Sequence, residues 1–217
     1  MPCNIGYRQV VKARLPVNNE ESIKEQTEAK IDQSLLEQIG EPDFIEWLLD
    51  LDIESLLGEA LRRALAKIKP DSKIKFSLKG FYLEAEAKDL TSVQKRGLGK
   101  VIDKTFNQFQ MEIFGIIAQL LDYEIMFSVD GNNLVLEGEK MEDKNVHKYL
   151  KILKDINGQA EIQFEHFSSE RELEQEEAKF VALAQKMGIK IVVKNREING
   201  KPIPNGVYHA NFLREKN

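Results

Sequence analysis

Two stretches of the chain, 71–92 and 122–143, alternate between apolar and polar residues with the period of two that is typical of β-strands. A glycine interrupts each stretch near its centre, Gly80 in the first and Gly131 in the second. Because glycine adopts the positive φ angles of tight turns, each stretch predicts a hairpin. The apolar positions that we expect on one face of each hairpin are Ile74, Phe76, Leu78, Phe81, Leu83, Ala85 and Ala87, and Ile125, Phe127, Val129, Leu134 and Leu136.

The two stretches also align with one another without a gap, at an offset of 51 residues. We interpret this similarity as an internal repeat of one hairpin–helix (ββα) unit, spanning 71–121 and 122–158. In the first hairpin, the lysines of one strand are expected to meet the glutamates of the other in cross-strand pairs. The identical positions are Asp71/Asp122, Ile74/Ile125, Phe76/Phe127, Ser77/Ser128, Gly80/Gly131, Leu83/Leu134 and Glu86/Glu137.

A helical subregion, the N-terminal helical arm, is predicted over 20–69. Gly40 and Pro70 are of the residue types that commonly end helices. They mark a helix boundary inside this region and the end of its last helix. We expect three helices here, at 19–39, 42–51 and 53–68.

Two further helices are expected beside the hairpins. One runs from Thr91 or Ser92 to Leu121 and is weakened by two close glycines at 97 and 99. Its second half is apolar on more than one helical face, which is typical of a central core helix. The other is predicted at 143–156, where it would complete the second ββα unit.

The ends of the chain contribute strands. Tyr7–Val17 is predicted as a strand, and its Pro16 disfavours a central position in a sheet. Towards the C-terminus a strand, a helix with a Ser-Glu-Arg-Glu capping box and another strand predict a βαβ unit with parallel strands, followed by a hairpin strand. These segments are 160–167, 169–188, 189–195 and 207–214. We therefore expect a single compact α+β domain, 1–217, with a mixed β-sheet of about eight strands.

Composition narrows the class of protein. The 217 residues carry a formal net charge of -5, which implies neither a wholly basic nucleic-acid binder nor a disordered acidic tail. The single cysteine, Cys3, excludes an intramolecular disulfide and a multi-thiolate metal site. No basic-then-apolar leader opens the chain, and its most apolar segment, Ile113–Leu121, is far shorter than a membrane span. We expect a cytoplasmic protein that does not enter a membrane.

Charge is segregated along the chain. From Glu20 to Glu59 there are thirteen acidic residues against two lysines, whereas 62–104 holds twelve basic residues against five acidic ones. If the basic block 62–104 and the basic C-terminal strands face one way, they would neutralise phosphates, and nucleic-acid binding is one alternative function. Its candidate residues are Arg62, Arg63, Lys67, Lys69, Lys73 and Lys75.

The acidic region contains a candidate docking helix. Phe44, Trp47, Leu48 and Leu51 are spaced at i, i+3, i+4 and i+7, the spacing of anchors on one helical face, and acidic residues lie between them. The same residues are also suited to covering the protein's own sheet. We predict them as partner-binding residues, with a protein partner or a second copy of the chain as the ligand.

Candidate catalytic residues are few. His147, His166 and His209 fall on three separate predicted elements, and no nucleophile-elbow, metalloprotease or dinucleotide motif is found. We predict no catalytic, cofactor-binding or metal site. The leading hypothesis is a non-enzymatic binding or assembly protein, and an enzyme of unknown class is a further alternative.

Overall fold

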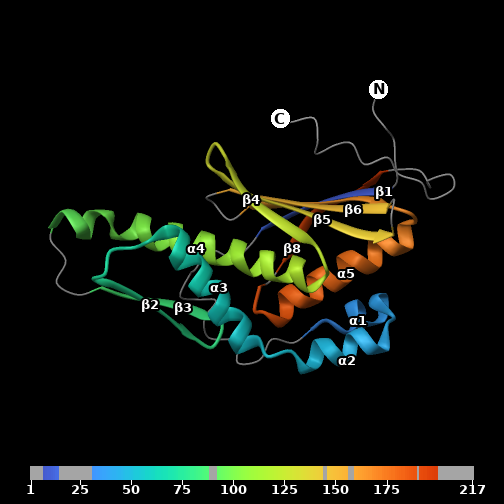
Figure 1. Ribbon diagram of the computed structural model, residues 1–217, viewed down its shortest axis with the longest axis horizontal. Helices are drawn as coiled ribbons and strands as arrows, with labels where there is room; N and C mark the ends of the chain where they lie inside the picture. Colours follow the sequence, from blue (N-terminus) through green and yellow to red (C-terminus); the bar gives the residue numbers. More distant parts are fainter. Residues whose placement is uncertain are drawn as a thin grey trace.

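The computed structural model of the protein describes residues 7–14, 31–87, 92–143, 146–155, 159–189 and 191–199. Within these residues, helices and strands form an α+β fold, as predicted. The prediction of one sheet with about eight strands was wrong, because the strands divide into a six-stranded sheet and a separate two-stranded hairpin. Figure 1 shows the large sheet on one side of the molecule and the hairpin on the other.

The six-stranded sheet has the strand order β4-β5-β6-β7-β1-β8. Every neighbouring pair in it is antiparallel, so the described sheet is not the mixed sheet that we expected. Its strands are β1 (Tyr7–Arg14), β4 (Glu124–Asp130), β5 (Asn133–Asp143), β6 (Val146–Lys154), β7 (Gln159–Phe167) and β8 (Val192–Asn199).

Strand β1 lies inside this sheet, although Pro16 favoured an edge. The last described residue of β1 is Arg14, which pairs with both neighbouring strands, and Pro16 lies outside the described residues. Because β7 and β8 are both antiparallel to β1, they run parallel to each other, as the βαβ prediction required. They are separated by β1 instead of being paired, and the predicted strand 207–214 lies outside the described residues.

The two predicted hairpins are present and have matching turns. Strands β2 (Ile74–Lys79) and β3 (Tyr82–Ala87) are joined by two residues, as are β4 and β5. The first turn residue is Gly80 in one hairpin and Gly131 in the other, with φ angles of 58° and 60°. A glycine at positive φ in the first central position is the signature of a type II′ turn, which suits the twist of a hairpin.

The two units differ after the hairpin, so the ββα repeat was wrong in its second half. The first hairpin is followed by a helix, but the segment predicted as a helix at 143–156 forms strand β6. The physical reason is the burial of Lys148 and Lys154 on the face of β6 that points to the core. These lysines hide the alternation of apolar residues that marks a strand.

The helices follow the sequence pattern closely. The third helix matches its predicted range of 53–68, and Gly40 ends the first helix at a φ of 63°. The long helix is continuous through Gly97 and Gly99, where we expected a weak point. The first helix begins only at Gln33, because Asp32 caps it, so the prediction of a continuous helix over 19–39 was wrong at residues 31 and 32. The part of that predicted helix before residue 31 lies outside the described residues. The helices are α1 (Gln33–Ile39), α2 (Pro42–Asp50), α3 (Ile53–Ile68), α4 (Ser92–Leu120) and α5 (Glu170–Lys186).

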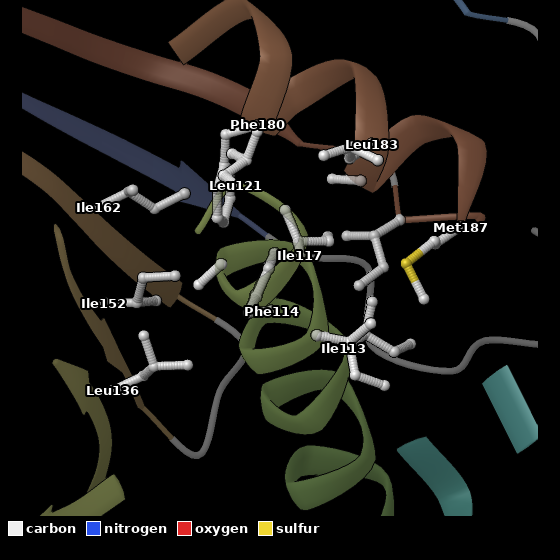
Figure 2. Close-up of a cluster of buried hydrophobic side chains, with 14 of the residues drawn as sticks. Ile113, Phe114, Ile117, Leu121, Leu136, Ile152, Ile162, Phe180, Leu183 and Met187 are labelled. Carbon is white, nitrogen blue, oxygen red and sulfur yellow. The ribbon is translucent and has the colours of Figure 1, made fainter. Parts of the chain in front are cut away.

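Helices α4 and α5 cover one face of the six-stranded sheet (Figure 1). The second half of α4 is the centre of the core, as its apolar composition predicted. Figure 2 shows its side chains between those of the sheet and those of α5. The labelled residues are Ile113, Phe114, Ile117 and Leu121 of α4, Leu136, Ile152 and Ile162 of the sheet, and Phe180, Leu183 and Met187 of α5.

Glycine 115 allows α4 to approach strand β4. A Cβ atom added at Gly115 would lie 2.7 Å from the ring of Phe127. Phe127 and its counterpart Phe76 are half-buried and pack against the core, as do Ile125 and Leu78. The predicted strand phase is therefore correct for these residues, whereas Val129 at the end of β4 is 69% exposed.

A β-bulge reorients the end of β7. Tyr7 of β1 is opposite Phe167, and Gln9 is opposite Phe164, so two residues of β7 face one residue of β1. The second of these two, His166, has a φ of 71°. The extra residue allows Phe164 and Phe167, three positions apart, both to be buried in the core.

Polar contacts hold the first two helices against α5. The backbone N–H of Asp32 donates to the Gln185 side chain at 3.0 Å, and the Gln175 side chain donates to the carbonyl of Ile39 at 3.2 Å. On α2, the carbonyl of Leu49 accepts a hydrogen bond from Lys186 at 3.0 Å. These hydrogen bonds hold both ends of α1, and the end of α2, against α5. The described part of the predicted N-terminal arm is therefore fixed to the rest of the molecule.

Candidate docking surfaces

The predicted docking helix is α2, which carries three of the four predicted anchors, and Leu51 follows its last residue. The four anchors have different environments. Leu48 is 0% exposed and belongs to the core, whereas Trp47 is 38% exposed. Phe44 and Leu51 are half-buried and pack against the core cluster. The core prediction therefore fits Leu48, and Trp47 is the predicted anchor with the most surface available to a partner.

Trp47 is held in place by its neighbours. Its ring centroid is 5.2 Å from that of Phe44, at an interplanar angle of 48°. Lys179 of α5 lies 5.1 Å above the Phe44 ring and forms an ion pair of 2.7 Å with Glu41. Because Trp47 packs on Phe44, which Lys179 contacts in turn, it loses less conformational entropy when a partner covers it.

The exposed side of α2 combines apolar and acidic residues. Leu49 is 54% exposed, and three acidic side chains of the same helix are exposed. On a helical projection these carboxylates lie between Trp47 and Leu49. Such a face matches a partner surface that combines basic and apolar groups. The acidic residues are Asp43, Glu46 and Asp50.

Three side chains of the basic block have acidic partners within the chain. Arg62 and Arg63 of α3 both donate to the Glu59 carboxylate at 2.7 Å, and these hydrogen bonds lower the pKa of Glu59 to about 2. Two of the six predicted nucleic-acid residues therefore share an acidic partner from their own helix. This pairing reduces the positive charge that the block offers to phosphates.

A third basic residue, Lys67, has an acidic partner although its side chain is 41% exposed. Its ammonium group lies 2.6 Å from the buried Glu112 carboxylate and 3.5 Å above the Phe127 ring. The remaining three predicted residues, Lys69, Lys73 and Lys75, are exposed. Lys69 follows the end of α3 at a φ of 50°, and Lys75 is opposite Glu86 in the first hairpin.

The cross-strand pairing expected in that hairpin is observed. Lys79 lies 3.6 Å from Glu84, and both side chains are largely exposed. Ion pairs of this kind contribute little stability, because both partners remain solvated. The amino groups of this hairpin are therefore easily shared with a second molecule.

A buried layer of charges joins the sheet to α5, and the sequence pattern did not reveal it. Lys140 and Lys148 are opposite each other on β5 and β6. Lys148 lies 2.5 Å from Glu172, and Lys140 lies 3.6 Å from Glu176. Burial alone would raise the pKa of Glu172, but hydrogen bonds from Lys148 and Ser168 lower it. These pairs fix the position of α5 on the sheet.

A second polar network lies on the opposite face of the sheet. The Tyr149 hydroxyl donates to Glu137 at 2.9 Å, and Lys151 donates to the same oxygen at 3.0 Å. Burial is the largest cause of the raised pKa of Tyr149, and the hydrogen bond to Glu137 raises this pKa further. A phenol with a raised pKa is a poor acid, so this tyrosine acts as a hydrogen-bond donor.

The described histidine side chain does not form a metal site. His166 lies 3.6 Å from its neighbour Glu165, the side chain of His147 is not described, and His209 lies outside the described residues. Among the described residues, no group of three or more histidine, cysteine, aspartate or glutamate side chains has the geometry to hold a metal ion.

None of the described helices has a stretch that is both long and apolar enough to cross a membrane.

Comparisons with known proteins identify no relative, because no protein-family model, curated protein or solved structure matches this chain.

Proposed function

We propose that the protein is a non-enzymatic binding or assembly protein that captures a protein partner through the exposed face of α2. The observation that supports this proposal is the position of Trp47, the only tryptophan of the chain, which is partly exposed and packs at a tilted angle against Phe44. Tryptophan side chains often dominate the binding energy of an interface. The acidic residues beside Trp47 favour a partner surface with basic and apolar groups.

Replacing Trp47 by alanine tests the proposal. We expect Trp47→Ala to lower partner affinity by at least about tenfold, because hot-spot truncations cost 2 kcal/mol or more. Stability should fall by only about 1 kcal/mol, since the side chain is partly exposed. Partners captured with the wild-type chain and then purified are compared by titration, and the fluorescence of Trp47 reports directly whether its environment changes on binding.

Leu48→Ala is the matched control on the same helix. Because Leu48 is fully buried, this variant should lose about 2 to 5 kcal/mol of unfolding free energy. Its folded fraction should keep the partner affinity. If purified partners bind Trp47→Ala as tightly as wild type, with no change in Trp47 emission on binding to wild type, α2 is not the docking helix.

Nucleic-acid binding is our second proposal, supported by the three exposed lysines Lys69, Lys73 and Lys75. It ranks lower because Arg62, Arg63 and Lys67 have acidic partners within the chain. If it holds, affinity for DNA or RNA falls steeply with salt, and glutamate at the three lysine positions weakens binding to all sequences. No binding at low salt to single-stranded or duplex probes would remove it. An enzyme of unknown class is the remaining alternative.

A further inference from the structure

Strands β2 and β4 occupy equivalent positions in the two hairpins, share an apolar framework and carry opposite charges. Both have isoleucine, phenylalanine and serine at the equivalent positions. In their charges, however, Lys73, the residue before β2, corresponds to Glu124, and Lys79 at the end of β2 corresponds to Asp130. The internal similarity therefore conserves the side of the strand that packs on the core and reverses the charge at its two ends.

Both strands have a free edge within the described residues. β4 is the first strand of the six-stranded sheet and pairs with β5, whereas β2 pairs with β3. An edge strand presents backbone N–H and C=O groups that can form hydrogen bonds with an added strand. β4 also carries two strongly exposed apolar side chains, Met126 at 58% and Val129 at 69%.

We propose that β4 of one molecule pairs with β2 of a second copy of this chain, joining the two-stranded hairpin to the edge of the six-stranded sheet. In an antiparallel register with Phe76 opposite Phe127, Lys73 is opposite Asp130 and Lys79 is opposite Glu124. Opposite charges at both ends stabilise such a pair. The apolar side chains then share one face, and Val129 is opposite Ile74.

Pairing of β4 with another β4 is disfavoured by the same charges. In the symmetric antiparallel register centred on Phe127, Glu124 is opposite Asp130 of the second strand, and like charges in this position are destabilising. Charges on edge strands commonly prevent such self-pairing. Lys79 of β2 and Lys73, the residue before it, supply the positive charges that two β4 strands lack when they face each other.

The partner strand must come from another molecule. The β2–β3 hairpin and the six-stranded sheet lie on opposite sides of α4 (Figure 1). One chain therefore cannot pair its own β2 with its own β4. Because each copy offers one strand of each kind, the contact is head-to-tail and leads to a ring or a filament unless two copies pair reciprocally.

The test is a charge exchange followed by sedimentation velocity over a range of protein concentrations at low salt. We expect wild type to self-associate, and we expect Lys73→Glu/Lys79→Glu and Glu124→Lys/Asp130→Lys each to weaken association at least about tenfold. An equimolar mixture of the two variants should regain it, because each acidic strand then meets a basic one. A chain with all four changes should also associate.

The mixture separates loss of the contact from loss of the fold, because a misfolded variant cannot be rescued by another. A wild type that remains monomeric at high concentration, or a mixture that fails to regain association, would overturn the proposal. So would stronger association of the single variant Glu124→Lys, since that change favours pairing of β4 with β4. Trp47→Ala should leave this association unchanged, which makes the test independent of docking by α2.

Discussion

At the scale of single residues, Lys154 is the least expected feature of the molecule. Its side chain is 1% exposed and donates a hydrogen bond to Asn107 of α4. Burial lowers its pKa from 10.5 to about 8, against the smaller opposite effect of Asp155. Because the charged form is disfavoured in the folded state, the folded protein is penalised at pH values below about 8. This penalty disappears as the pH rises towards 10.5.

We therefore expect Lys154→Met to stabilise the protein at pH 7 by about 3 kcal/mol, the free energy that corresponds to such a pKa shift. The gain should be largely lost at pH 10, where the wild-type lysine is neutral in the folded state. Urea unfolding of both proteins at the two pH values measures the difference. An equal effect of the substitution at pH 7 and pH 10 would contradict the lowered pKa.

His166 provides a second prediction at this scale. Its φ of 71° is unfavourable for a side chain with a Cβ and most unfavourable for a β-branched one. His166→Gly should leave stability within about 1 kcal/mol of wild type, because glycine relieves the strain of this conformation but gains freedom in the unfolded state. His166→Val should cost about 1 to 3 kcal/mol. If valine is tolerated as well as glycine in urea unfolding, the bulge does not impose this backbone conformation.

At the scale of elements, Gly188 connects α5 to the first hairpin. It follows α5 at a φ of 77°, and a Cβ atom placed there would lie 2.6 Å from the ring of Phe81. Gly188→Ala should therefore destabilise the protein by about 1 to 3 kcal/mol, through both backbone strain and collision with the hairpin turn.

Gly58 is the matched control for this substitution. It is exposed in the middle of α3, and no atom lies within 4 Å of an added Cβ. Gly58→Ala should stabilise the protein by about 0.5 to 1 kcal/mol, since alanine is the better helix former. Thermal unfolding of the two variants should thus give shifts of opposite sign, and shifts of the same sign would refute the contact between Gly188 and Phe81.

Also at this scale, the sequence predicted most helices and both hairpins because local signals define them. Gly80 and Gly131 specify the turns, and helix 53–68 has a clear apolar stripe with an Asp52 cap. Strand β6 could not be predicted from the same signals. Val146, Tyr149, Leu150 and Leu153 recur with helical spacing, while the buried Lys148 and Lys154 interrupt the alternation of a strand. Their charged and polar partners lie on α5 and α4, far away in sequence.

The predicted anchors on α2 show the same limit. Their spacing correctly identifies one helical stripe, but it does not tell which member faces the protein's own core. That depends on how α2 packs in the folded molecule, where Leu48 is buried and Trp47 is not. Similarly, no local signal indicates that the two hairpins belong to different sheets.

At the scale of the whole molecule, the layer formed by α1 and α2 depends on α5. Gln175 and Gln185 hydrogen-bond to the two ends of α1, at Ile39 and Asp32. Replacing both glutamines by alanine should increase the hydrogen-exchange rate of α1 amides by about 30-fold, because each of the two lost bonds contributes about 1 kcal/mol. Amides of β5, β6 and β7 serve as the control and should keep their exchange rates. Unchanged exchange in α1 would mean that these contacts do not hold it.

The place of β1 between β7 and β8 has a consequence for how the chain folds during synthesis. The first described strand leaves the ribosome long before either of its partners, because its pairs join residues far apart in the sequence, such as Arg14 with Gln159 and Val192. Until the last third of the chain has been made, β1 has no strand to pair with. The sheet then lacks the strand that joins β7 to β8. Contacts of such long sequence separation slow folding and leave strand edges open to other chains. The nascent protein is therefore expected to need protection until β8 has emerged.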